Sequence, residues 1–159
     1  MSVSLQPHCD SPRLPVEGLT AEARRLPGGR IELGYRLTGD LDRLLIPELS
    51  DPSRADELWR HTCFEIFILK ADAPGYVEFN FASTGRWAAY SFRSRRSGMQ
   101  NIAGVTEAPI GTLTVGRQFV LKATVDVSGV EGLPPADAPW QAAISTVIEA
   151  ADGRRAYWA

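Results

Sequence analysis

The sequence predicts an all-β protein, an antiparallel β-sandwich, and three observations support this fold class. Short runs of alternating apolar and polar residues recur along the 159-residue chain. Gly, Pro, Asp or Ser bounds these runs, and no long amphipathic helical pattern separates them. Strands that follow one another in this way are typical of two packed antiparallel sheets. The length and the 44% apolar content suit one domain with its own core.

Residues 1–15 are expected to form a flexible N-terminal lead-in. They are mostly polar and contain Pro7, Pro12 and Pro15, which suit an extended chain better than a helix. The sandwich is therefore predicted to occupy residues 16–159 as a single domain without internal repeats.

The first two predicted strands form a hairpin. In residues 30–38, "RIELGYRLT", apolar side chains alternate with polar or small ones, so one face of the strand is buried. The preceding segment, 19–26, contains helix-favouring residues, but Gly28 and Gly29 suit a tight turn between strands. Strand is the favoured prediction there. A polar, proline-containing loop is predicted over 39–57.

The remaining strands are predicted where short apolar runs lie between turn-forming residues. They lie at 63–69, in a hairpin over 75–92, at 118–127, at 141–150 and near the end of the chain. Asp152 and Gly153, which precede that last strand, are a strong hairpin signal.

The register of the hairpin at 75–92, "GYVEFNFASTGRWAAYSF", determines which side chains share a face. If Thr84 and Gly85 form a two-residue loop, Phe81 pairs with Ala88. The apolar side chains of both strands then lie on one face, which favours this register.

The opposite face of this hairpin is the candidate ligand-binding surface. In the predicted register Glu78 lies opposite Ser91, and Asn80 lies opposite Ala89. Small residues therefore leave space beside hydrogen-bonding groups and aromatic rings, as in a pocket for a small polar ligand. The alternative is an ordinary solvent-exposed sheet face. The candidate site residues on this face are Tyr76, Glu78, Asn80 and Trp87.

Four separated motifs resemble bacterial DOMON-like proteins. These proteins are similar in turn to family-nine carbohydrate-binding modules and to the DOMON domains that hold haem or sugars. The resemblance implies an immunoglobulin-like or jelly-roll sandwich and a function in binding rather than catalysis. In the family the chain continues beyond "YWA", so a terminal segment is expected to be absent here. The motifs are "LWRHTCFE" (58–65), "EFNF" (78–81), "STGRWAAY" (83–90) and "GM" (98–99), and the resemblance runs from about residue 39 onward.

Three more residues are candidates for ligand contacts. Trp59 and His61 belong to the first motif, and Arg86 opens the basic run "RWAAYSFRSRRSG". Guanidinium groups recognise carboxylates and phosphates, so this run favours a negatively charged ligand, with a solvated loop as the alternative. The expected ligand is a small polar molecule, and a saccharide is the leading class.

The sequence does not favour a metal, a cofactor or an enzyme. His8, Cys9, His61 and Cys63 lack the spacing of zinc motifs. Both thiols are expected to be free, with Cys63 buried and Cys9 exposed. Haem binding through His61 and Met99 is an alternative. The favoured interpretation is that Met99 packs under its own loop and binds no haem. No nucleophile motif, paired acidic motif or phosphate loop is present, so a non-catalytic protein is predicted.

The net charge of −2 predicts no partnership with nucleic acid or an anionic membrane. The sequence shows neither a secretory leader nor an apolar run of membrane-spanning length, which favours a cytoplasmic protein. A protein-interaction module that uses Trp59, Trp87 and Trp140 is the third functional hypothesis. The oligomeric state is left open.

Overall fold

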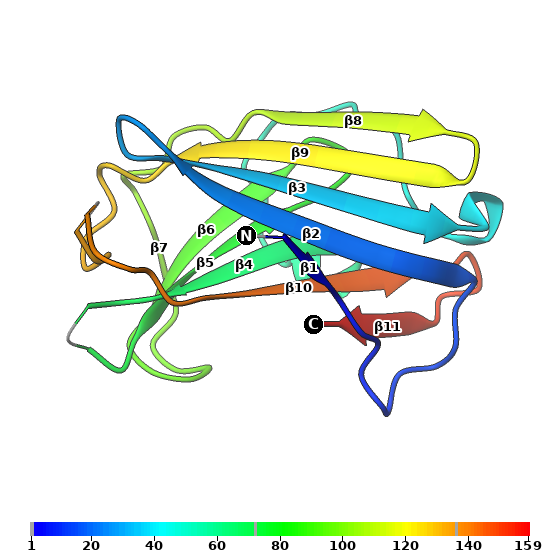
Figure 1. Cartoon of the computed structure of the whole chain (residues 1–159), viewed down its shortest axis with the longest axis horizontal. Coiled ribbons are helices and arrows are strands. Elements are labelled where there is room, and N and C mark those ends of the chain that lie inside the picture. Colours follow the sequence, from blue (N-terminus) through cyan, green and yellow to red (C-terminus); the bar gives the residue numbers. More distant parts are fainter. Residues whose placement is uncertain (1, 72, 136) are drawn as a thin grey trace.

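Two antiparallel β-sheets pack face to face in the computed structural model, which describes residues 2–71, 73–135 and 137–159 (Figure 1). This confirms the predicted sandwich. Within the described residues the only helices are two 3-10 turns, η1 (Leu41–Arg43) and η2 (Leu58–Arg60). Neither they nor any other described segment forms a helix long and apolar enough to cross a membrane.

The five-stranded sheet has the order β1-β2-β3-β9-β8. Its strands are β1 (Ser2–Ser4), β2 (Val16–Leu26), β3 (Arg30–Gly39), β9 (Gln118–Asp126) and β8 (Ile110–Val115). The strands predicted near β2, β3 and β9 are confirmed. The sequence did not indicate β8 because its Leu113 and Val115 point to solvent and give no apolar face.

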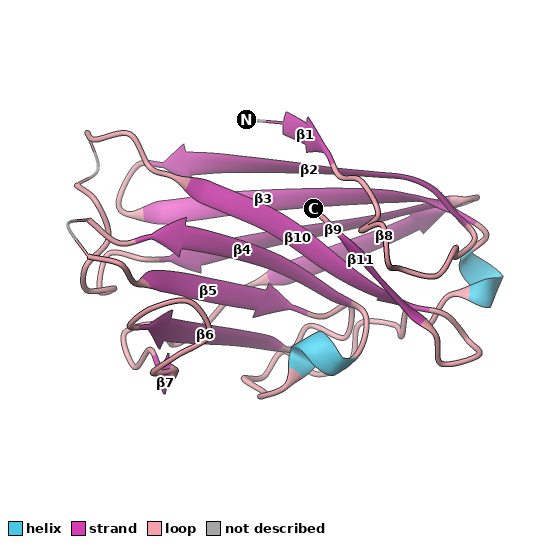
Figure 2. Cartoon of the chain, turned by 90° about the horizontal axis from the view of Figure 1, so that it is seen from below, coloured by secondary structure: helices cyan, strands magenta, loops and turns pink. Residues whose placement is uncertain are grey.

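The six-stranded sheet has the order β11-β10-β4-β5-β6-β7, and Figure 2 shows β10, β4, β5 and β6 side by side. Its strands are β11 (Arg155–Trp158), β10 (Ala142–Glu149), β4 (Cys63–Leu69), β5 (Tyr76–Phe81), β6 (Trp87–Phe92) and β7 (Gln100–Asn101). Every longer strand here was predicted. The two-residue β7 is too short to leave a pattern in the sequence.

The core lies between the inner faces of the two sheets. In β3 every second side chain points inward, and Leu33, Tyr35 and Leu37 are almost fully buried. Across the core they face Phe64 and Phe79 of the other sheet. The Tyr35 hydroxyl donates a hydrogen bond to the backbone carbonyl of Glu65 at 2.8 Å, so the buried phenol is satisfied. Burial of each such large apolar side chain contributes about 1.5–3 kcal/mol to stability.

The segment expected to be a flexible lead-in contacts both sheets. β1 pairs with β2, and Leu5 is only 4% exposed within the core. Gln6 and Ala159 exchange backbone hydrogen bonds of 2.8 and 3.0 Å, so the chain also borders β11. Proline excludes helix here, as expected, but one buried leucine anchors the segment to the core. The division of the chain at residue 16 remains a prediction.

The register predicted for the β5–β6 hairpin is wrong by one residue. Phe81 pairs with Trp87 instead of Ala88. The amide of Ala82 donates to the carbonyl of Arg86 at 2.9 Å, so the loop has three residues, 83–85, rather than two. A slip of one residue moves every side chain of a strand to the other face. Trp87 therefore enters the core, and Tyr90, instead of Ser91, lies opposite Glu78.

Candidate functional site

Polar side chains gather on the outer face of the six-stranded sheet. Glu65 of β4 lies between Asn80 of β5 and Ser145 of β10, because these residues pair across the strands. Glu78 lies two residues before Asn80 and shares its face. We call Glu65, Glu78, Asn80 and Ser145 the polar row. It crosses three central strands of the sheet, on the side away from the main core.

The polar row is largely buried and mostly hydrogen-bonded. Glu65 is 7% exposed and Glu78 is 8% exposed. The Ser145 hydroxyl donates to Glu65 Oε2 at 2.5 Å, and Asn80 Nδ2 donates to Glu78 Oε1 at 2.9 Å. The amide oxygen Oδ1 of Asn80 is buried and has no partner among the described residues. Such an atom is costly unless a ligand or a water satisfies it.

Burial changes the acidity of both carboxyl groups. It raises the pKa of Glu65 to about 7, an effect that the Ser145 hydrogen bond reduces and the nearby Glu78 charge increases. Burial also raises the pKa of Glu78, and the hydrogen bond from Asn80 opposes that rise. At neutral pH the row is therefore a set of hydrogen-bond acceptors that carries less than its full negative charge.

Aromatic rings border the polar row on two sides. Trp59 packs edge-on against Tyr90, with ring centroids 5.7 Å apart. On the other side Tyr76 stacks on Phe92 at 4.6 Å and contacts Phe67 at 5.9 Å. Trp59, Phe67 and Tyr76 are each partly exposed. The face thus combines acceptors with accessible ring surfaces.

The structure brings together four of the predicted site residues. Tyr76, Glu78 and Asn80 share the outer face, and Trp59 covers its β6 side. Trp87 does not belong to the site, because the corrected register buries it in the core at 4% exposure. It was expected to form an aromatic wall. The ring on the outer face of β6 is that of Tyr90, which is itself buried and packs against Trp59.

His61 and Arg86 lie at a separate pocket of about 290 Å³ at the end of the hairpin. His61 Nδ1 is 2.7 Å from Glu149 Oε2. The Arg86 guanidinium donates to Asp51 Oδ2 at 3.1 and 3.0 Å. Because Asp51 already balances its charge, Arg86 gives less support to an anionic ligand than the sequence indicated.

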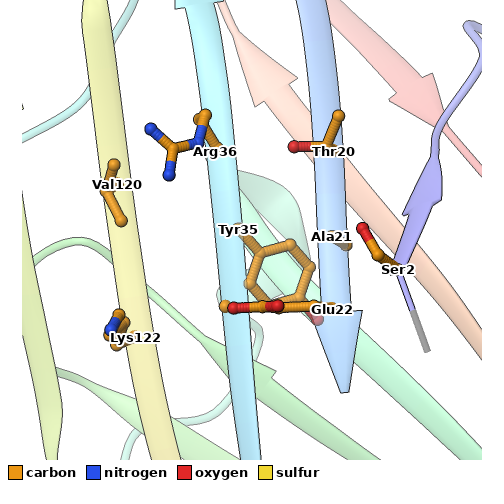
Figure 3. Close-up of a pocket in the computed structure, with 9 residues that line it drawn as sticks. Ser2, Thr20, Ala21, Glu22, Tyr35, Arg36, Val120 and Lys122 are labelled. Carbon is orange, nitrogen blue, oxygen red and sulfur yellow. The ribbon is translucent and has the colours of Figure 1, made fainter.

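Another hollow, of about 180 Å³, lies on the outer face of the five-stranded sheet. Figure 3 shows Glu22, Arg36 and Lys122 around it, from three neighbouring strands. Gly34 contributes to its floor, since a Cβ there would come within 3.1 Å of the Glu22 side chain. The hollow includes none of the predicted site residues.

Sequence reasoning missed three residues of the candidate site. Glu65 is the single charged residue within the apolar run "CFEIFIL", which is a signal that could have identified it. Tyr90 was placed on the wrong face by the register error. Ser145 left no signal, because its contact with Glu65 depends on a strand pairing between distant segments.

The cysteines are free, with Cys9 exposed and Cys63 buried, as predicted. His8, Cys9 and Asp10 have ligand atoms within 4.8 Å of one another, but all three residues are exposed. The expectation that Met99 packs under its loop is wrong, since this side chain is about half exposed. The pocket that His61 lines does not include Met99.

The chain is similar in fold to a solved bacterial protein. The crystal structure of a putative carbohydrate-binding protein from Bacteroides uniformis superimposes with a TM-score of 0.58. The match covers 97% of this chain and 76% of that chain at 13% sequence identity, so it shows the fold alone. No protein-family model matches the chain, and no curated protein matches it.

Proposed function

We propose that the protein is a non-catalytic module that binds a small neutral saccharide on the outer face of the six-stranded sheet. The observation that carries this proposal is the polar row, with the partly exposed ring of Trp59 on one side and those of Phe67 and Tyr76 on the other. A saccharide uses both kinds of surface at once, through its hydroxyl groups and the apolar faces of its ring.

The chemistry of the face suits a ring with many hydroxyl groups. Carboxylate and amide oxygens of Glu65, Glu78 and Asn80 accept hydrogen bonds, which sugar hydroxyls donate. The apolar faces of a sugar ring pack on aromatic rings such as those of Trp59 and Tyr76. Two neighbouring carboxyl groups disfavour an anionic ligand at the row, so a neutral sugar fits better than an acidic one.

Two further observations support this assignment. The sandwich resembles that of a protein described as carbohydrate-binding, although the low identity restricts that likeness to the fold. The motifs at 58–65 and 78–81, on which the resemblance to DOMON-like proteins rests, contain Trp59, Glu65, Glu78 and Asn80. We therefore also propose that the chain is a DOMON-like domain. That it works in the cytoplasm is a separate proposal, which does not follow from these motifs.

The test is a titration of the purified protein with neutral sugars. A glycan array of neutral monosaccharides and oligosaccharides identifies a binder, and calorimetry then gives its dissociation constant. The variant Glu78→Gln keeps the acceptor that Asn80 uses but removes the charge, so we expect binding to weaken by at least about tenfold. Trp59→Ala should weaken binding as well, through lost ring contact.

The matched control is Glu48→Gln, which removes an exposed carboxylate outside the polar row. It should bind as the parent does. If Glu78→Gln binds the sugar as tightly as Glu48→Gln, the polar row is not the binding site. If no neutral sugar binds the parent protein, the proposed saccharide binding is wrong. Release of smaller sugars during prolonged incubation would show that the module is an enzyme.

A further inference from the structure

A further pocket lies between the two sheets, apart from the polar row and from the two hollows described above. Its volume is about 550 Å³, within the range of small-molecule sites. The inner-face side chains of Ile31, Ile66 and Ile68 line it together with Ala142, so its interior is aliphatic. The three isoleucines are otherwise almost fully buried core residues. This pocket is thus an opening into the hydrophobic core at one end of the sandwich.

Trp140 and Arg25 border this inter-sheet pocket. The indole Nε1 of Trp140 donates to the carbonyl of Pro135 at 3.1 Å, which fixes the ring. The Arg25 guanidinium lies 5.2 Å from the ring centroid of Trp140 and donates to the carbonyl of Ala138 at 2.8 Å. These contacts hold a cation and an aromatic ring at the edge of an apolar space.

The charged residues that line the inter-sheet pocket are basic. An adjoining hollow of about 680 Å³ shares Arg25 and Trp140 and adds Arg30, whose charge also acts on its strand partner Asp126. Arg24 lines both spaces but also pairs with Glu22 and Glu32 at 3.6 and 4.0 Å. Among the described residues that line the two spaces, none is acidic. The local charge therefore favours an anion beside an apolar interior.

We propose that the inter-sheet pocket binds a small amphiphile whose apolar body lies against Ile31, Ile66 and Ile68 and whose anionic group meets Arg25. A guanidinium recognises carboxylates, sulfates and sulfonates, and its position over Trp140 places it next to the apolar space. The proposal does not depend on the saccharide site. That site lies on the outer face of the six-stranded sheet, whereas the inter-sheet pocket borders the inner face of the same sheet.

The test uses two fluorescent probes with the same apolar body. Anilinonaphthalene sulfonate carries a negative charge, and its uncharged parent, phenylnaphthylamine, does not. Both should bind the folded protein with one site, and the sulfonate should bind about tenfold more tightly because of Arg25. Arg25→Gln should abolish that preference while leaving the affinity for the uncharged probe within about twofold.

A second pair of variants tests the location. Ala142→Phe fills the pocket from the inner face of β10, whereas Ala143→Phe places the same ring on the outer face of that strand. Both alanines are exposed, so both variants should fold. Ala142→Phe should abolish binding of both probes, and Ala143→Phe should bind them as the parent does.

Several outcomes would overturn the proposal. If neither probe binds, or if Ala142→Phe binds both as tightly as the parent, the pocket is not a ligand site. If the parent binds the two probes equally well, or if Arg25→Gln weakens the binding of both probes equally, then Arg25 does not recognise an anionic group. Neither probe is a sugar, so these results leave the saccharide titration independent.

Discussion

Glu65 is a carboxyl group that folding removes from water between two neighbouring strands. Its pKa rises from 4.5 to about 7, mainly because burial disfavours the charged form. At a pH between these two values, the carboxyl group is protonated in the folded protein but has already lost its proton in the unfolded chain. Stability must then fall as the pH rises from about 4.5 to about 7 and level off above that range. The raised pKa of Glu78 acts in the same direction.

Replacement of Glu65 by glutamine should remove most of this pH dependence. Between pH 5 and pH 8 the parent should lose up to about 3 kcal/mol of unfolding free energy, measured from urea midpoints. Glu65→Gln stays neutral and should lose much less, while Ser145 can still donate to its side-chain oxygen. Exposed Glu48→Gln serves as the control and should follow the parent. Equal slopes for parent and Glu65→Gln would show that Glu65 does not titrate as the buried acid described above.

Among the elements, the β5–β6 hairpin shows how local chemistry decides which residues form a site. Both strands were predicted from their alternating pattern, but the loop between them was taken as two residues long. Gly85 has a φ of +94° and ends a three-residue loop, in which a glycine at the last position is favoured. Apolar residues occur on both faces of β6, so the pattern alone could not distinguish the two registers.

Substitution of this glycine tests the loop. Gly85→Ala forces a side chain into the left-handed region and brings its Cβ within 3.1 Å of Leu49 and 3.4 Å of Pro52. Gly153→Ala is the matched control, because Gly153 has a φ of +84° but open space around it. The control should lose about 1–2 kcal/mol of unfolding free energy, and Gly85→Ala should lose clearly more. Equal losses in urea denaturation would mean that the hairpin loop does not pack on Leu49 and Pro52.

For the whole molecule, the sequence was sufficient for the sandwich but for only part of the site. Periodic strands such as β3 and β9 repeat one physical rule, burial of every second side chain, and that rule is visible without coordinates. The polar row depends on which strands become neighbours. The Ser145 and Glu65 contact joins residues eighty positions apart, and no local pattern specifies such a pairing. The inter-sheet pocket is likewise a product of tertiary packing.

The N-terminal segment provides the last prediction, because it connects both sheets of the molecule. A flexible lead-in would tolerate any substitution, yet Leu5 is buried in the core and its amide donates to the carbonyl of Leu19 at 2.9 Å. Leu5→Ala should therefore lower the unfolding free energy by about 2–5 kcal/mol, through lost apolar burial and the cavity left behind. The neighbouring Gln6→Ala keeps the backbone bonds to Ala159 and removes an exposed side chain, so it should change stability by less than about 0.5 kcal/mol. If urea denaturation gives the same midpoint for both variants, the segment does not belong to the core, and the boundary predicted at residue 16 stands.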